Sequence, residues 1–246
     1  MPLSSNSLIH LTNSKDALFG ILSEGFRVKY CKEKIKFGKG QISIHVPMVS
    51  FCDIPLSQIK DHIGSYGSYG IGLSKEWAVK NLLNPVLYVQ QKSNLATSYE
   101  NVARHYLADK VETDEAIRAF DHLMDVARYM KNYEGPLVRK SGSHKSYRFS
   151  DEREWRYVPE ISYPCEIFYR HDEFDEEARI KAAKSLSDLR LGFEASDIKY
   201  VIIDSEDEID EVVEHLERIC GKKYSYSDLK KLTTRILTAQ QIRTDI

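Results

Sequence analysis

The sequence contains little cysteine and no long apolar run. Its four cysteines, Cys31, Cys52, Cys165 and Cys220, are scattered without a Cys-x-x-Cys pair, so a zinc ribbon is excluded and we predict no bound metal. Scattered cysteine is also typical of a reducing compartment, and we expect a cytoplasmic protein. No segment approaches the roughly 20 consecutive apolar residues that span a bilayer, and the N-terminus does not resemble a signal peptide. We therefore expect no membrane partner.

An excess of one charge, internal repeats and low-complexity linkers are also missing. The 35 Lys and Arg residues nearly balance 37 Asp and Glu residues, so the field of the whole molecule does not predict a polyanion partner, and only a local basic patch stays open. A chain of 246 residues is long enough to bury on the order of 70–75 % of its unfolded surface. We predict one α+β domain over residues 1–246, with a helical insertion at about 95–130 and a C-terminal αβα extension at about 165–246.

Apolar periodicity predicts the order of the elements. A helix over Lys15–Glu24 begins after Asn13-Ser14 and ends at Gly25. The lysine-rich segment 30–40 is interpreted as a mobile loop or hairpin, and 131–148 as an irregular basic loop. The same patterns predict strands at 46–51 and 198–203 and a helix at 206–220.

A charged cluster at 149–159 runs directly into an alternating strand. On a strand Glu152 and Glu154 share one face, while Arg153 and Trp155 point to the other. Two like charges on one face repel each other, so we do not expect such a pair unless something binds there. The two glutamates are therefore our first candidates for catalytic residues. The alternative is a solvated edge strand with cross-strand ion pairs, which add little to stability.

A second candidate region combines a histidine with a glycine-rich stretch. His10 stands at a predicted strand end, just before a helix, where a lone histidine usually has a structural role. Residues 64–73 hold four glycines and two tyrosines, Tyr66 and Tyr69. Such a backbone bends sharply or lies against a ligand, although a surface turn explains the same composition.

The order of these motifs resembles the ADP-ribosyltransferase fold, and within it the AbiGi-type phage-resistance (abortive infection) family. The resemblance covers the chain from Leu8 to Pro159 and implies a split, mixed β-sheet core with a helical insertion. The motifs that carry it are His10-Leu11-Thr12, Ile21-Leu22-Ser23-Glu24-Gly25, Ser50-Phe51-Cys52-Asp53-Ile54-Pro55, the stretch from Tyr66 to Trp77, and Glu152-Arg153-Glu154-Trp155-Arg156.

The resemblance implies NAD as a substrate and no metal. Glu154 takes the role of the catalytic glutamate that holds the 2'-hydroxyl of the nicotinamide ribose, and Glu152 resembles the first member of a Glu-x-Glu pair. Breaking the bond between nicotinamide and ribose develops oxocarbenium character, which a nearby carboxylate stabilises. We therefore expect a single glutamate to account for most of the rate of this bond cleavage.

The same resemblance places further residues around NAD. His10, with Thr12 beside it, is expected to bond the ribose, and Ser50 is expected at the same site. The family's aromatic position holds Gly72 here, so Tyr69 or Tyr66 has to stack on the nicotinamide from a shifted place. Arginines such as Arg27 or Arg153 are candidates for the NAD diphosphate; the alternative for Arg27 is an ordinary surface arginine at a helix exit.

The acceptor is expected to bind just before the catalytic glutamate. Cations mixed with aromatic side chains suit phosphates and unpaired bases, and by the resemblance RNA is favoured over DNA. The alternative is a solvated charged loop. The residues that we expect to bind nucleic acid are Arg139, Lys140, Lys145, Tyr147 and Arg148.

Three functional hypotheses follow. The first is an NAD-dependent ADP-ribosyltransferase that acts as the toxin of a phage-defence system and has a cognate antitoxin protein as its partner. The second is a non-enzymatic antitoxin or regulator of the same kind of system, which binds a partner protein. The third is an RNA-binding or nuclease-like protein that uses the basic loop without NAD.

Overall fold

The computed structural model describes residues 5–108, 113–139, 142–219 and 222–245. These residues group into two compact units, each made of segments that are discontinuous in the sequence. The first unit comprises Met1–Arg27, Ser50–Leu83 and Arg190–Ile246, and the second comprises Val28–Val49 and Asn84–Leu189.

The first unit is built on a mixed sheet. Its strands follow the order β15 (Ile236–Thr238), β14 (Ile198–Ile203), β5 (Tyr69–Ser74) and β1 (Ser7–Thr12). Strands β14 and β15 are parallel, whereas β5 is antiparallel to both of its neighbours. The predicted α+β class with a mixed sheet is confirmed at this level.

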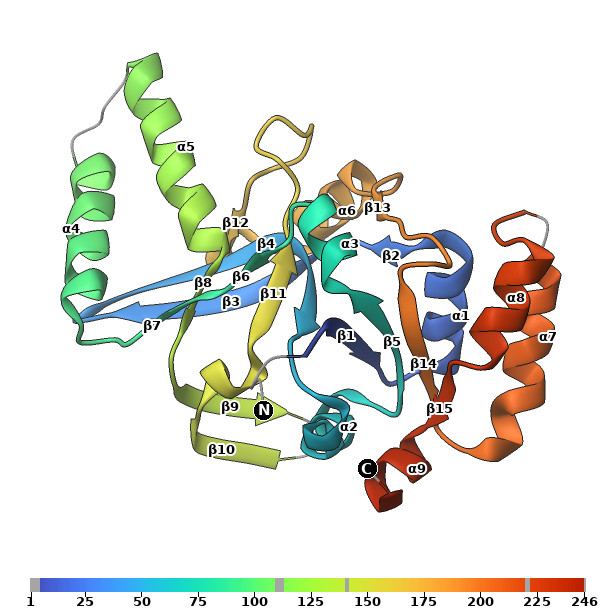
Figure 1. Ribbon diagram of the computed structural model, residues 1–246. Coiled ribbons are helices and arrows are strands. Elements are labelled where there is room, and N and C mark those ends of the chain that lie inside the picture. Colours follow the sequence, from blue (N-terminus) through green and yellow to red (C-terminus); the bar gives the residue numbers. More distant parts are fainter. Residues whose placement is uncertain (1–4, 109–112, 140–141, 220–221, 246) are drawn as a thin grey trace. The chain divides into compact units, whose positions relative to one another are not determined.

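Helices cover both faces of this sheet. Because side chains alternate along a strand, Ile9 and Ile202 face α2 (Lys60–Tyr66) and α9 (Ala239–Asp245), with which they form an apolar core. On the opposite face α1 (Lys15–Glu24) contacts β1, β5 and α7 (Ile209–Ile219), and α7 contacts α8 (Tyr226–Thr233), as Figure 1 shows in blue and red. The Ser14 hydroxyl accepts from the Ala17 amide, so α1 begins as predicted.

The first unit also contains two smaller strands and a short helix. Strand β2 (Phe26–Arg27) pairs with β13 (Arg190–Leu191), and the helix is α3 (Lys75–Lys80).

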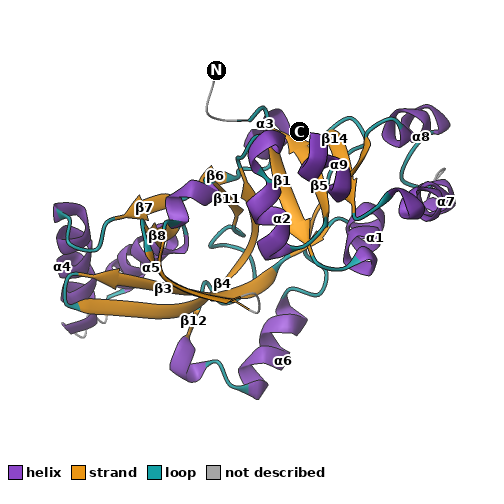
Figure 2. Ribbon diagram, turned by 90° about the horizontal axis from the view of Figure 1, so that it is seen from below, coloured by secondary structure: helices purple, strands orange, loops and turns teal. Residues whose placement is uncertain are grey.

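The second unit contains a long antiparallel hairpin of β3 (Lys29–Phe37) and β4 (Gly40–Cys52), whose last residues belong to the first unit. The hairpin interpretation of the segment 30–40 is therefore confirmed. Figure 2 shows this pair with the short β12 (Tyr169–Arg170) beside β4. The Asn132 amide joins β8 (Met130–Asn132) to β3 by accepting from the Lys36 N–H and donating to the Lys36 carbonyl.

Two helices pack on the inner face of this hairpin. They are α4 (Asn94–Ala108) and α5 (Asp114–Arg128), in the segment where the sequence predicts helix. Apolar residues of both helices, including Ala96 and Met124, meet Ile35 and Val46 of the hairpin in one core. Thr113 caps α5 by accepting from the Ala116 amide.

The segment 131–148 is not an irregular loop, so that prediction is wrong. It contains β8 and a second hairpin of β9 (Gly135–Arg139) and β10 (Gly142–Tyr147). The remaining elements of the second unit are β6 (Asn84–Pro85), which pairs with β11 (Glu154–Tyr157), β7 (Leu87–Val89), which is parallel to β8, and α6 (Glu176–Ser185). Among the residues described, no helix is long and apolar enough to cross a membrane.

Candidate functional site

Strand β11 carries the candidate catalytic residue into the interior of the second unit. Its side chains alternate, so Glu154 and Arg156 are buried while Trp155 and Tyr157 are half-buried on the other side. Glu152 is not on this strand: it ends a 3₁₀ turn over Phe149–Glu152, and Arg153 follows with a left-handed φ of 44°. The expectation that strand alternation puts both glutamates on one face is therefore wrong.

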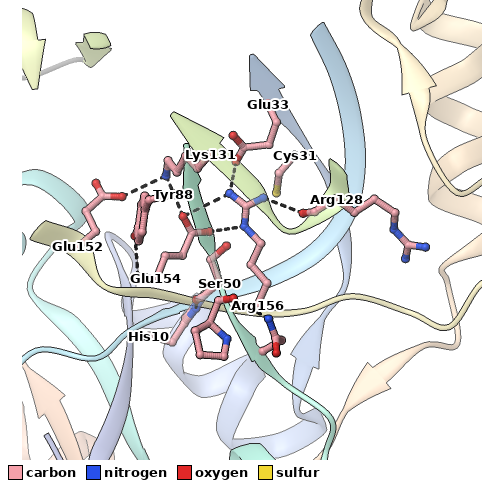
Figure 3. A network of polar contacts seen from close by, with 12 residues as sticks. His10, Cys31, Glu33, Ser50, Tyr88, Arg128, Lys131, Glu152, Glu154 and Arg156 are labelled. Atoms are coloured by element: carbon pink, nitrogen blue, oxygen red, sulfur yellow. Dashed lines mark hydrogen bonds and ion pairs between the residues drawn. The ribbon is translucent and has the colours of Figure 1, made fainter. Parts of the chain in front are cut away.

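Arg156 is the centre of a buried polar network, shown in Figure 3. Its Nε donates to Glu154 Oε1 at 2.7 Å, and its terminal nitrogens donate to Glu33 Oε1 at 2.7 Å and to the Arg128 carbonyl at 2.8 Å. The Arg156 side chain has 0% exposure. A guanidinium without solvent needs such partners for its donors.

Lys131 supplies the second cation. Its ammonium lies 2.8 Å from Glu154 Oε2 and 3.1 Å from Glu152 Oε2, and it also stands over the ring of Phe149. The glutamates that the sequence singled out are thus brought together by a lysine of β8. The Tyr88 hydroxyl of β7 accepts from the Glu154 amide at 2.8 Å and fixes the start of β11.

The network shifts the acidity of its carboxyl groups in opposite directions. Burial alone favours the neutral form of Glu154, but the charges and hydrogen bonds of Arg156 and Lys131 outweigh it and hold the pKa of Glu154 well below its usual range. At Glu33 burial outweighs the attraction of Arg156 and Lys131, and the nearby Glu154 and Glu152 add repulsion, so its pKa is raised. Glu154 is therefore a fixed anion, whereas Glu33 takes a proton more readily than Glu154 does.

Both carboxylate oxygens of Glu154 accept from cations. Oε1 accepts from Arg156, and Oε2 accepts from Lys131 and, at 3.3 Å, from Arg156. The side-chain exposures are 6% for Glu154 and 2% for Glu152. These contacts tie β11 to Lys131 of β8, and they leave little of either carboxylate in contact with solvent.

The predicted ribose-binding histidine lies in the first unit. His10 Nδ1 donates to the Ser50 carbonyl at 2.9 Å, and the ring packs against Phe26 and Phe51. Thr12 pairs with Tyr69 across β1 and β5. The structure thus brings His10 to Ser50 and Thr12 to Tyr69, as four residues of one unit.

The other predicted NAD contacts in this unit have partners within the unit. The Tyr69 hydroxyl donates to Glu208 Oε1 at 2.9 Å, and the Tyr66 ring stacks on His62. Arg27 is exposed and forms an ion pair with Glu24 at 2.9 Å.

The glycines of the tyrosine-rich stretch have a packing reason. Gly67 has a φ of 118° and ends α2, and a Cβ there would overlap the Thr12 carbonyl. A Cβ at Gly72 would overlap the ring of Tyr200. Close contact with the protein's own backbone and side chains accounts for these two positions.

The predicted nucleic-acid residues that the structure describes lie on β9 and β10 and just after them. Lys145 and Arg148 are exposed, Arg148 stands over the Tyr133 ring, and Tyr147 meets Phe149 edge to face. Arg139 lies in β9, and Lys140 lies outside the described residues.

Sequence reasoning missed Glu33, Tyr88 and Lys131. They come from β3, β7 and β8, which are far from β11 in the sequence. The sequence held only a weak signal for two of them. Lys131 directly follows the last residue of an apolar helical stripe, and Glu33 is a lone acid among alternating lysines. Neither pattern indicates which carboxylate or cation will be its partner.

Comparison with known proteins identifies the family. A family model described as "Putative abortive phage resistance protein AbiGi, antitoxin" matches residues 24–204, well over half of the chain. A relative from Lactococcus lactis subsp. cremoris, named "Abortive phage resistance protein AbiGi", is 28% identical over 221 residues, which cover 82% of this chain and 89% of the relative. No solved structure matches the chain, so the ADP-ribosyltransferase fold stays a prediction. The chain belongs to the AbiGi family of abortive phage resistance proteins.

Proposed function

We propose that this chain is the non-enzymatic antitoxin of an abortive phage resistance system and restrains a cognate toxin protein by binding it. The observation that carries the proposal is the state of Glu154, which is buried and accepts from Arg156 and Lys131 through both oxygens. The family description, which includes the word antitoxin, supports the same role. An antitoxin of this kind needs a stable binding surface and no reactive group.

The transferase hypothesis makes a demand that this geometry does not meet. A catalytic glutamate has to accept a hydrogen bond from the ribose 2'-hydroxyl and face the developing positive charge. Glu154 already faces two cations, and their positive charge opposes the development of a third cationic centre beside them. The carboxylates as arranged here therefore do not fit NAD, and a structural role for the Glu152–Glu154 pair is favoured.

The proposal is tested by expression and by NAD chemistry. Expressed alone in a bacterial host without the system, the chain should leave growth unchanged, because the proposed role is to bind a toxin and not to modify a cellular target. Co-expressed with the protein encoded beside it in its source genome, it should relieve the growth arrest which that protein causes. Purified protein incubated with NAD should release no nicotinamide above the buffer level, as measured by chromatography.

A matched pair of variants separates the two functions. Glu154→Gln removes the network's central carboxylate, and Glu160→Gln removes one from an exposed residue nearby. Growth arrest by the chain alone, with nicotinamide release that is lost in Glu154→Gln and kept in Glu160→Gln, would overturn the proposal and establish the transferase. Thermal unfolding of each variant, recorded in parallel, distinguishes lost chemistry from lost folding.

A further inference from the structure

The β3–β4 hairpin has two faces of opposite character. In β3, Ile35 and Phe37 belong to the core, and Glu33 on the same face bonds to Arg156. The pairing of β3 with β4 is continuous from Lys29 to Phe37. The residues of β3 that alternate with Glu33, Ile35 and Phe37 therefore point their side chains to the other face. Those side chains include Lys32, Lys34 and Lys36, which form a basic row that the proposed function does not use.

Histidines extend this row onto the neighbouring strands. Lys32 is paired with His45 of β4, which in turn is paired with Tyr169 of β12. The Lys32 ammonium lies 2.6 Å from His171 Nε2, and His171 Nδ1 lies 2.9 Å from His45 Nε2. The ring of Phe174 stacks on His45 at 4.1 Å and carries the Arg179 guanidinium on its surface.

No carboxylate among the described residues forms an ion pair with Lys32, Lys34, Lys36 or Arg179. The acids of the adjacent turn, Asp172 and Glu173, pair with Arg170 instead. The pKa of His45 is lowered by burial and by the positive charges of His171, Lys32 and Arg179. The surface is therefore locally positive on a molecule whose formal charge is -2.

We propose that this outer face of the β3–β4 hairpin binds the phosphodiester backbone of a nucleic acid. Alternate residues on a strand stand roughly 6.5 Å apart, so the lysine row presents regularly spaced ammonium groups to an extended polyanion. Lysine neutralises phosphates as a point charge and without reading bases. The binding is accordingly independent of base sequence and falls steeply with salt.

The composition of the face favours nucleic acid over other anionic partners. None of the large exposed apolar side chains of the described residues lies on β3, β4 or β12. A membrane-binding surface inserts such side chains between lipids, and a protein interface has an apolar or aromatic centre within a polar rim. The inference goes beyond the antitoxin role and does not depend on it, because it concerns a different surface and a different ligand.

The test uses the full chain and fluorescence anisotropy. The probes are a labelled 20-nucleotide poly-uridine RNA and a labelled 20-base-pair DNA, each titrated at 50 and 200 mM salt. We expect salt-dependent binding to at least one probe. The triple variant Lys32→Gln, Lys34→Gln, Lys36→Gln should weaken binding at least tenfold and reduce the salt slope by about 2 for the single strand, at roughly 0.7 for each lost phosphate contact.

The control variant carries the same charge change on exposed lysines elsewhere, Lys80→Gln, Lys92→Gln, Lys184→Gln. It should bind as the unmodified chain does. Equal loss of binding in both triple variants, or no loss in the first, would overturn the proposal. Failure of the unmodified chain to bind either nucleic acid would also overturn it. Vesicles that contain phosphatidylserine serve as a further probe, and binding to these vesicles alone would count against the proposal. Circular dichroism melts confirm that both variants fold.

Discussion

Single charges decide the behaviour of the buried network. Arg156 is shared by Glu154, Glu33 and a backbone carbonyl, so the removal of one partner leaves an uncompensated charge in the interior. A buried ion pair adds little stability over an apolar replacement, but breaking it is strongly destabilising. The two carboxylates that Arg156 contacts are nevertheless not equivalent, because their pKa values are shifted in opposite directions.

This difference predicts unequal effects of two isosteric substitutions. Glu154→Gln should lower the free energy of unfolding by about 3 kcal/mol or more, because the charged form of Glu154 is the one that Arg156 and Lys131 stabilise. Glu33→Gln should cost much less, since burial already disfavours its charged form. Urea unfolding of both variants at pH 7 measures the difference. Equal losses would contradict the assignment of Glu154 as the fixed anion.

The buried histidine predicts a pH dependence of stability. The pKa of His45 is lowered in the folded state, so the unfolded chain, with a histidine pKa of about 6.5, binds more protons between the two values. The contribution of His45 to stability is complete above about pH 6.5 and is lost as the pH falls toward the folded pKa. Unfolding of His45→Gln should therefore depend less on pH between 7 and 5 than unfolding of the exposed-site control His122→Gln. The same pH slope in both variants would speak against this origin.

At the scale of elements, two glycines of the first unit predict opposite outcomes. Gly72 in β5 faces the Tyr200 ring, so Gly72→Ala overpacks the sheet and should cost about 1–3 kcal/mol. Gly64 lies in α2 and is exposed, and a Cβ added there would meet no atom within 4 Å, so Gly64→Ala should be neutral or gain up to about 1 kcal/mol. Thermal unfolding compares the two. A loss in Gly64→Ala that matched the loss in Gly72→Ala would show that packing against Tyr200 is not the cause.

Elements with strong local signals were predictable, and those without them were not. Helix α1 has a capping serine and a terminal glycine, and β14 is strongly apolar apart from Lys199, so both are found where the sequence predicted them. Strand β9 begins with Gly-Pro and β10 is mostly polar, and neither has a period-2 apolar pattern in the sequence that would predict a strand. The left-handed Arg153 separates the turn that carries Glu152 from the strand that begins at Glu154, and no local residue preference predicts this conformation.

At the scale of the whole molecule, neither the lysine row nor the cations of the buried network could be predicted from composition. A formal charge of -2 gave no hint of the lysine row, which becomes visible only once the hairpin sorts its residues onto two faces. The glutamate pair was found from sequence, but its cations were not, because Lys131 and Glu154 are joined by tertiary structure alone. The sequence thus predicted the glutamates of the buried network. Their protonation state could be inferred only from the structure, because it depends on partners from other strands.

The interleaving of the two units has a consequence for synthesis on the ribosome. Strand β14, which joins β15 to β5 in the first unit, belongs to the segment 190–246, which is translated after both segments of the second unit. Until β14 has left the exit tunnel, β1 and β5 lack this neighbour, whereas β3 and β4 already have the helices α4 and α5 that cover them. The second unit, whose segments end at Leu189, can therefore fold on the ribosome before the first, so the basic row of its hairpin forms before the sheet of the first unit is complete.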